Sequence, residues 1–252
     1  MPPAPGPPRV VSLVPSLTEA VAVTVPGALV GATDWCSHPA NLGVTRVGGT
    51  KNPDVRRIVA LAPDLVVANE EENRAPDLAE LRAAGVEVLV TEVRTLEQAF
   101  RELRRVLAAC AARSGRGAGA PRWLDEAEAA WGDLPAPTAR LRAAIPIWRR
   151  PWMVLGRDTF AGDVLARLGV DNAYAAHAER YPRVPVEELR AAGLDLVVLP
   201  DEPYRFTRDD GPEAFSARTP VALVSGRHLT WYGPSLAEAP AVLSAALRAA
   251  CR

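Results

Sequence analysis

Three residues that can bind metal ions alternate in one short stretch of the chain, TDWCSHP at residues 33–39. Asp34, Cys36 and His38 each offer a different ligand atom, and alternate positions of an extended segment point to the same side. Trp35, which lies among them, offers an aromatic face to a bulky ligand. The stretch is therefore compatible with a metal site, a ligand pocket or an ordinary loop. The elements around it distinguish these three alternatives.

A dedicated four-ligand metal site has little support. The chain has three histidines, His38, His177 and His228, and none forms an HxH or HxxxH pair with another. His38 could still be a single axial ligand to cobalt or iron, because neutral imidazole is a common metal ligand, or a loop histidine without a metal role. Cys36 could bind a soft metal or be a small buried apolar residue.

Length and composition indicate a globular chain of one large domain or two lobes. The chain has 252 residues, against about 100 to 200 residues for an average domain. Charged residues make up 23% of it and nearly cancel, to a net charge of -1, so we expect no nucleic acid partner. The longest apolar runs fall far short of the roughly 20 residues that span a bilayer, so we expect no membrane insertion.

The first residues and the cysteines predict a cellular location. The segment MPPAPGPPRV carries proline and glycine where a secretory signal needs an apolar run of about 7 to 15 residues. The three cysteines are widely spaced, with no CxxC pair, which fits a reducing compartment. We therefore expect a cytoplasmic monomer, with export as the alternative if a leader was removed.

Expected strands and helices alternate along the chain, which predicts an α/β fold with parallel sheets. In the first half we expect strands at 10–14, 29–33, 64–68 and 86–90, and helices at 55–61, 75–84 and 96–113. In the second half we expect strands at 143–148, 152–155, 195–199 and 221–225, and helices at 160–168, 186–192 and 235–250. Ser16 and Glu19 have the spacing of a capping box, which predicts another helix start.

The breaks in this pattern predict the domains. A glycine-rich stretch, SGRGAGAP at residues 114–121, separates two helical segments and indicates a flexible joint. We expect an amino-terminal α/β lobe at 1–114, a linker helix region at 115–138 and a carboxyl-terminal α/β lobe at 139–252.

Two segments half a chain apart share one pattern. Residues 58–71 read IVALAPDLVVANEE, and residues 189–202 read LRAAGLDLVVLPDE. Each predicts the end of a helix, a buried Asp-Leu-Val-Val strand and a pair of acids beyond it, so we expect two lobes of similar topology with a ligand cleft between them. Because ligands bind beyond the carboxyl ends of parallel strands, the TDWCSHP loop and both acidic pairs should lie at the binding edges.

Five stretches follow one another in a familiar order from Arg9 to the last helix. They read RVVSLVPSLTE, GATDWCSHP, RVGGTKNPDVRRIVALAPDLVVA, RYPRVPVEELRAAGLDLVVL and HLTWYGPSLAEAP. Together they resemble the helical-backbone class of substrate-binding proteins, closest to the cobalamin-binding receptors of ABC importers. The resemblance implies two α/β lobes joined by a long rigid helix, with cobalamin, a ferric siderophore, haem or a bare metal ion bound between them.

The resemblance and the strand ends together supply a list of candidate ligand-binding residues. By resemblance, the loops that line the site carry Ser16, Trp35, Cys36, His38, Thr50, Trp231 and Tyr232. We expect the aromatic residues among these to stack on the ligand. Three acids lie past expected strand ends, namely Glu70, Glu71 and Glu202. Acids at such positions could orient a ligand or cap the next helix. A further aromatic set could form a wall or cover the sheet edge, and its members are Tyr181, Tyr204 and Phe206.

The same resemblance implies an ABC transporter permease as a partner. Receptors of this class carry a surface glutamate on each lobe, which docks onto arginines of the permease. Glu187 occupies this place in the second lobe, whereas Arg56 stands at the equivalent place in the first, a reversal of charge that would repel a transporter arginine. Thr50 and Lys51 stand where the cobalamin receptor carries an aromatic residue, so the ligand stays open among cobalamin, haem and ferric chelates.

These observations predict a non-catalytic protein that captures a corrinoid, a haem-like molecule or another metal chelate. The chain contains no GxSxG, GxxxxGK[ST] or HExxH motif, which lowers the case for catalysis. Two alternatives stay open. The first is a chelatase-like or tailoring enzyme that uses the same cleft, with His38 close to Glu71 or Glu202. The second is an importer receptor whose leader is missing.

Overall fold

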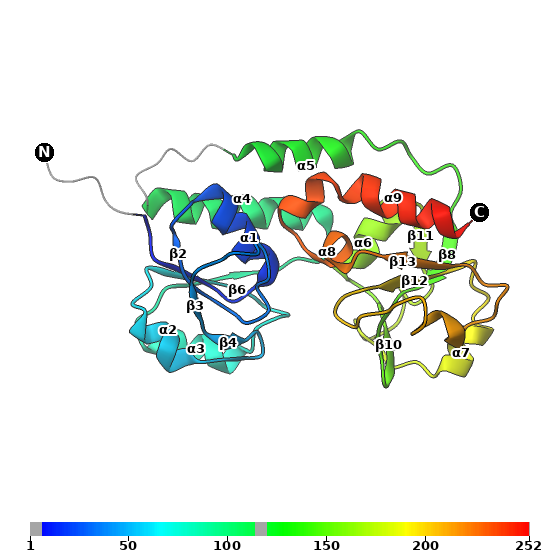
Figure 1. Ribbon diagram of the computed structural model, residues 1–252, viewed down its shortest axis with the longest axis horizontal. Coiled ribbons are helices and arrows are strands. Elements are labelled where there is room, and N and C mark those ends of the chain that lie inside the picture. Colours follow the sequence, from blue (N-terminus) through cyan, green and yellow to red (C-terminus); the bar gives the residue numbers. More distant parts are fainter. Residues whose placement is uncertain (1–6, 114–119, 252) are drawn as a thin grey trace, which may run out of the picture. The chain divides into compact units, whose positions relative to one another are not determined.

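The computed structural model describes residues 7–113 and 120–251, which form two compact units (Figure 1). Unit 1 contains the residues up to Val93, Glu97–Asp125 and Tyr232–Pro234, and unit 2 contains Arg94–Leu96, Glu126–Trp231 and the residues from Ser235 on. The lobe boundaries expected at residues 114 and 139 stay a prediction. Most of the glycine-rich joint, residues 114–119, lies outside the described residues.

Unit 1 is built on a five-stranded parallel sheet. Its strand order is β3 (Thr45–Arg46), β2 (Leu29–Ala32), β1 (Val10–Ser12), β6 (Leu65–Asn69) and β7 (Val88–Thr91). Its helices are α1 (Pro15–Thr24), α2 (Val55–Ala60), α3 (Ala75–Ala83) and α4 (Leu96–Arg113), and a two-stranded ribbon joins β4 (Gly48–Gly49) and β5 (Asn52–Pro53). Every residue of β1 and β6 is buried, as expected for the inner strands of a parallel sheet.

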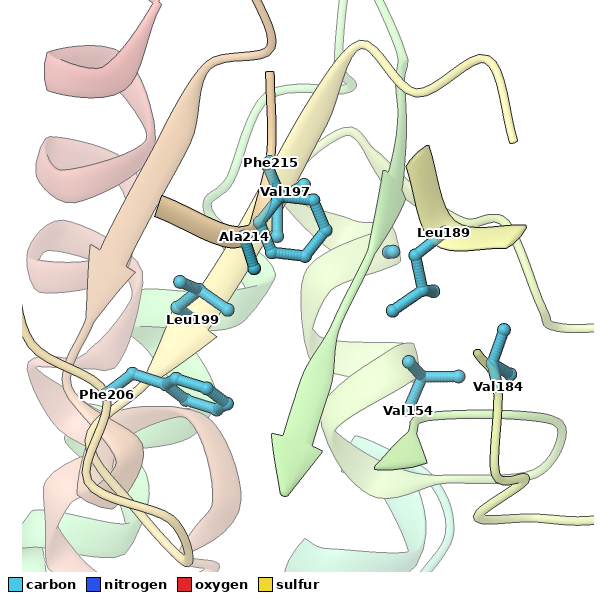
Figure 2. Close-up of a cluster of buried hydrophobic side chains, with 9 residues drawn as sticks. Val154, Val184, Leu189, Val197, Leu199, Phe206, Ala214 and Phe215 are labelled. Atoms are coloured by element: carbon cyan, nitrogen blue, oxygen red, sulfur yellow. The ribbon is translucent and has the colours of Figure 1, made fainter. Parts of the chain in front are cut away.

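Unit 2 repeats this plan with a four-stranded parallel sheet. The strand order is β11 (Val170–Asn172), β8 (Leu141–Ala144), β12 (Leu196–Pro200) and β13 (Val221–Val224), with an antiparallel hairpin of β9 (Pro146–Arg149) and β10 (Trp152–Val154). Its helices are α6 (Phe160–Arg167), α7 (Val186–Ala191), α8 (Gly226–Thr230) and α9 (Ala239–Ala250), while α5 (Arg122–Gly132) begins in unit 1 and ends in unit 2. Figure 2 shows Leu199, Phe206 and Phe215 within the core of this unit.

The two units share a local design that the repeated sequence pattern predicts. In each, a six-residue helix (α2 or α7) leads into a five-residue buried strand (β6 or β12). The turn between them contains a residue with positive φ, Ala62 at 44° and Gly193 at 63°. The aspartate that follows accepts a hydrogen bond from a backbone N–H of a neighbouring segment, at 2.8 Å for Asp64 and 2.9 Å for Asp195. The expected α/β fold with two parallel-sheet units is confirmed.

The capping box expected at Ser16 and Glu19 is wrong. Helix α1 begins at Pro15, and its N-cap residue, Val14, provides no side-chain capping hydrogen bond. A proline in the first turn suits a helix start because its φ angle is already helical and its missing N–H would have no partner there. Ser16 and Glu19 are instead 3% and 6% exposed, so the start of α1 is turned into the protein.

Some short elements appear where no element was expected. Strand β11 and helix α8 have three and five residues, too few for a hydrophobic period to show in the sequence. The single strand expected at 143–148 is divided, because β8 ends at Ala144 and β9 begins at Pro146. Across the described residues, no helix combines the length and the apolar character that crossing a membrane requires.

Candidate functional site

The carboxyl ends of the parallel strands in unit 1 carry most of the candidate residues. The TDWCSHP loop follows β2, the glutamates from Glu70 on follow β6, and Ser16 lies in the first turn of α1, just after β1. In an open parallel sheet, ligands bind beyond this edge because the loops there converge around the strand ends. This edge is therefore the candidate site of unit 1.

Trp35 is the most exposed large apolar side chain in the described part of the chain. It is 68% exposed. The indole lies close to the β4–β5 ribbon, since a Cβ atom added at Gly49 would lie 3.5 Å from Trp35 Nε1. An aromatic ring at this position presents a large apolar surface to solvent, and covering such a surface is favourable. Trp35 can therefore stack on a flat ligand.

Cys36 points into unit 1 instead of toward solvent. It is fully buried, and its Sγ lies 2.9 Å from Thr18 Oγ1 and 3.2 Å from Thr33 Oγ1. Burial raises the pKa of the Cys36 thiol, although these contacts and the charge of Arg46 oppose the shift. A thiol that stays protonated is a poor metal ligand. The contacts of Cys36 hold the loop in place.

The alternation of Asp34, Cys36 and His38 does not produce one face of metal ligands. Asp34 is exposed, Cys36 is buried, and half-buried His38 has its Nδ1 atom 3.0 Å from the Oγ atom of Ser37. Among residues 7–113 and 120–251, no group of three or more His, Cys, Asp or Glu side chains is placed to hold a metal ion. Axial ligation by His38 alone stays a prediction.

Two asparagines hold the acidic loop beyond β6. The Oδ1 atom of Asn69 accepts hydrogen bonds from the backbone N–H groups of Glu71, at 2.9 Å, and Glu72, at 3.3 Å. Asn73 donates from Nδ2 to the carbonyl of Thr50 at 3.0 Å, so the loop is tied to the neighbouring ribbon. This frame fixes the backbone of Glu71 and Glu72, and Glu70 is the exposed glutamate of the loop.

Glu72 is a candidate residue that sequence reasoning missed. The hydroxyl of Tyr232, a residue that belongs to unit 1, donates to Glu72 Oε1 at 3.4 Å, and Tyr232 is 6% exposed. Burial raises the pKa of Glu72 to about 7, while the Tyr232 hydrogen bond opposes this shift, Glu71 adds to it and Lys51 opposes it. Burial also raises the pKa of Tyr232 well above its ordinary value. Nothing in three consecutive glutamates distinguishes the third, so the sequence carried no signal for this pair.

In unit 2, the equivalent strand end holds Glu202 against Trp231. The indole Nε1 of Trp231 donates to Glu202 Oε2 at 2.9 Å, and Trp231 is 7% exposed. The backbone N–H of Gly226 donates to Asp201 Oδ1 at 2.6 Å. A Cβ atom at Gly226 would lie 2.6 Å from the backbone nitrogen of Glu202, so the close approach of these two segments requires glycine.

The remaining expected aromatic residues have different environments. Phe206 is 3% exposed and stacks on Trp152, with ring centroids 5.9 Å apart, inside the unit 2 core (Figure 2). Tyr204 is half-buried, and its hydroxyl donates to Asp210 Oδ2 at 2.6 Å. Tyr181 is half-buried beneath the guanidinium of a neighbouring arginine. Packing in the core thus explains the position of Phe206, whereas Tyr204 and Tyr181 are partly exposed at the surface.

Each of the two α/β units has a parallel sheet, with aromatic and acidic side chains at the strand ends. These features define the class of two-lobed substrate-binding proteins. Residues 10–222 match the periplasmic binding protein family. The chain therefore belongs to the periplasmic binding protein family.

Characterised relatives and solved structures agree with this family. The vitamin B12-binding protein of Salmonella typhimurium LT2 is 29% identical over 193 residues, which cover 76% of this chain and 72% of that protein. A periplasmic haem-binding protein from Pseudomonas aeruginosa is 28% identical, with a TM-score of 0.72 over 95% of this chain and 92% of that chain. The periplasmic vitamin B12-binding protein BtuF of Vibrio cholerae shares the fold, with a TM-score of 0.74 at 19% identity over 98% of each chain.

The expectation of a cytoplasmic protein is wrong. The family is that of periplasmic binding proteins, and both solved relatives are periplasmic, which points to export. The number and spacing of cysteines do not report the compartment of a protein whose thiols are buried in its interior. Cys36 and Cys110 are both fully buried free thiols, which is common for cysteine in a protein interior.

Proposed function

We propose that this protein is a non-catalytic receptor for a bulky, largely planar metal chelate of the corrinoid or haem type. The observation that carries the proposal is the exposed ring of Trp35 at the carboxyl edge of the unit 1 sheet, in a chain whose relatives are named for vitamin B12 and haem. A planar ring ligand gains most from aromatic faces, because they offer contact area at a low cost in side-chain entropy.

The loops around Trp35 support a binding role because hydrogen bonds within unit 1 hold them in place. The contacts of Cys36 with Thr18 and Thr33 hold the TDWCSHP loop, and Asn69 holds the acidic loop through backbone hydrogen bonds. A site whose loops are already fixed pays less conformational entropy when it binds. The bound chelate would supply its own metal, which suits a site without a set of protein ligands.

The groups that an enzyme would use have structural partners here. Glu202 accepts the indole N–H of Trp231, and His38 lies beside Ser37. We favour a receptor over a chelatase-like or tailoring enzyme because the relatives of this chain are named for the ligands that they bind. Binding of the ligand in the cleft expected between the two lobes stays a prediction.

The test is a titration of the purified protein with cyanocobalamin and with hemin, followed by tryptophan fluorescence and visible absorption. We expect saturable binding of one of the two chelates, and a Trp35→Ala affinity at least about tenfold weaker, because a central aromatic contact is typically worth more than 1.4 kcal/mol. Trp123→Phe is the control, since Trp123 is a half-buried residue whose indole donates to Thr24. No saturable binding of either chelate would overturn the proposal.

His38 can be tested in the same experiment. If it is an axial ligand, His38→Ala shifts the visible absorption bands of the bound chelate, because the axial ligand changes the electronic structure of the metal. An unchanged spectrum would show that His38 is a residue of the loop and not a ligand to the metal.

We further propose that the receptor acts as a monomer and passes its ligand to an ABC importer permease. Glu187 is exposed in the first turn of α7, where a permease arginine could reach it. Arg56 is exposed at the matching place in α2. Binding to a vitamin B12 importer reconstituted in vesicles should weaken with Glu187→Ala and strengthen with Arg56→Glu, relative to a Glu80→Ala control. Unchanged binding by both variants would exclude this docking mode.

A further inference from the structure

The side-chain amide of Asn73 is buried and hydrogen-bonded on both sides. Asn73 is 3% exposed, and its Oδ1 atom accepts the backbone N–H of Asn69 at 2.9 Å. Its Nδ2 atom donates to the backbone carbonyl oxygens of Leu13, at 3.2 Å, and Thr50, at 3.0 Å. These partners fix the orientation of the amide, because a flipped amide would set its oxygen against two carbonyl oxygens.

The three partners of this amide belong to three separate segments of unit 1. Leu13 directly follows β1, Asn69 is the last residue of β6, and Thr50 lies in the turn of the β4–β5 ribbon. Strands β1 and β6 are already paired in the sheet, whereas the ribbon forms a separate two-stranded sheet. The hydrogen bond to Thr50 therefore fastens the tip of the ribbon to the strand ends of the main sheet.

A second tie connects the same turn to the acidic loop. The ammonium group of Lys51 donates to the backbone carbonyl of Glu71. Lys51 is exposed, so water competes for this hydrogen bond. Hydrogen bonds are stronger away from water, so the buried amide of Asn73 is the better anchor of the turn.

The ribbon in turn supports the loop that carries Trp35. The backbone N–H of Asp34 donates to the carbonyl oxygen of Gly48 at 2.9 Å. The indole lies close to the next residue of the ribbon, since a Cβ atom at Gly49 would lie 3.5 Å from Trp35 Nε1. Trp35 is 68% exposed, so its ring has little other packing to hold it. The position of the ribbon therefore affects the position of this ring.

We propose that Asn73 is a positioning residue of the unit 1 site, which fixes the β4–β5 ribbon and, through the ribbon, orients Trp35 for a flat ligand. The inference rests on the proposed function, in which Trp35 contacts the chelate. A contact residue that is already oriented loses less conformational entropy on binding. The hydrogen bonds of Asn73 should therefore increase the affinity for the ligand although Asn73 itself is buried behind the ribbon turn.

The main test uses the variant Asn73→Asp. A carboxylate keeps an acceptor for the Asn69 N–H group but loses both donors, so it would face the carbonyl oxygens of Leu13 and Thr50 unfavourably. Asn41→Asp is the matched control, because it adds the same charge at an exposed asparagine of unit 1. For whichever of cyanocobalamin and hemin the wild type binds, we expect about tenfold weaker binding in Asn73→Asp and unchanged binding in Asn41→Asp.

A double-mutant cycle with Trp35→Ala separates positioning from a general loss of structure. If Asn73 acts through Trp35, the change Asn73→Asp weakens binding about tenfold in the wild type and less than about threefold in Trp35→Ala, where the ring is absent. The same loss of affinity in both backgrounds would show that Asn73 does not act through Trp35, and would overturn the inference.

A second measurement needs no ligand. In an NMR spectrum of the indole N–H groups, the Trp35 resonance is assigned by its loss in Trp35→Phe. We expect this resonance to move in Asn73→Asp and to stay in place in Asn41→Asp. The resonance of Trp131, a buried residue whose indole donates to the carbonyl of Leu236 at 3.0 Å, should be unchanged in both variants and reports an intact fold. A Trp35 resonance that does not move in folded Asn73→Asp contradicts the proposal.

A third measurement uses the unmodified chain and does not depend on how the variants fold. The side-chain amide protons of Asn73 should exchange with solvent much more slowly than those of Asn41, because both are hydrogen-bonded in a buried position. Equal exchange rates would exclude the anchoring role. If the wild type binds neither chelate, the proposed function fails, while the indole and amide measurements still decide whether Asn73 positions Trp35.

Discussion

The indole N–H of Trp231 donates to the carboxylate of Glu202 at 2.9 Å, and the ring of Trp231 is buried in unit 2. The sequence predicted each of these residues as a separate ligand contact, whereas the structure joins them. The carboxylate accepts a hydrogen bond from the N–H group of a buried ring, and the guanidinium of Arg227 lies 6.0 Å from the centre of the same ring. Glu202 therefore acts first as a positioning residue for Trp231.

Removal of the Glu202 carboxylate should destabilise unit 2. Glu202→Ala leaves the buried indole N–H without this acceptor, which costs about 1–3 kcal/mol. Glu202→Gln keeps an acceptor oxygen at the same distance and should lose less stability. Denaturant unfolding followed by tryptophan fluorescence measures both variants. If Glu202→Ala were as stable as the wild type, the hydrogen bond would have no structural role.

A methyl group at Gly226 should disturb the same contact from the opposite side. The Cβ atom of Gly226→Ala would lie 2.6 Å from the backbone nitrogen of Glu202, and backbone cannot move aside cheaply. We expect a loss of about 1–3 kcal/mol in the free energy of unfolding, as in other overpacked sites. Gly132→Ala is the matched control, because nothing lies within 4 Å of a Cβ atom at that position. Equal stability of the two variants would contradict the close packing.

Glu72 should make the stability of the protein fall as pH rises toward neutrality. Its pKa is about 7 in the folded protein, against 4.5 for an ordinary glutamate, so the folded state retains a proton that the unfolded state has lost. The stabilising contribution is complete below the unfolded pKa and is lost as pH rises through the folded pKa. Glu72→Gln should therefore gain stability relative to the wild type more at about pH 8 than at about pH 5. Denaturant unfolding at both pH values measures this, and an equal difference at both would contradict it.

The three cysteines should differ strongly in reactivity. Cys36 and Cys110 are buried, and burial raises the pKa of both thiols, to about 11 for Cys110. Cys251 is exposed near the end of the chain. Because the thiolate is the reactive form, a thiol reagent at mild alkaline pH should modify one cysteine rapidly in the native protein and all three after denaturation. Cys251→Ser should remove the rapid phase, and a rapid phase that remains would show that a core thiol is accessible.

The longer elements could be predicted from the sequence because their periodicity is visible over several turns. Helix α4 has the limits 96–113 that its apolar period predicts, and the buried strand β6 lies within one residue of its expected position. Helix α8 was missed because its five residues contain little more than one turn. The wrong capping box at Ser16 has a related cause, since a spacing of three residues occurs often by chance and Pro15 already provides a helix start.

The sequence by itself determined the α/β class, the two similar units and the loops that lie at the strand ends, because these depend on local patterns of apolar residues and turns. Only the tertiary structure decided what each residue of those loops does. It turned Cys36 inward and left Trp35 exposed, and it placed the half-buried Glu72 against Tyr232 while Glu70 stayed in solvent. Neighbouring residues of one loop differ in this way because burial and hydrogen bonding depend on segments distant in the sequence, and no local pattern records which segment will pack against them.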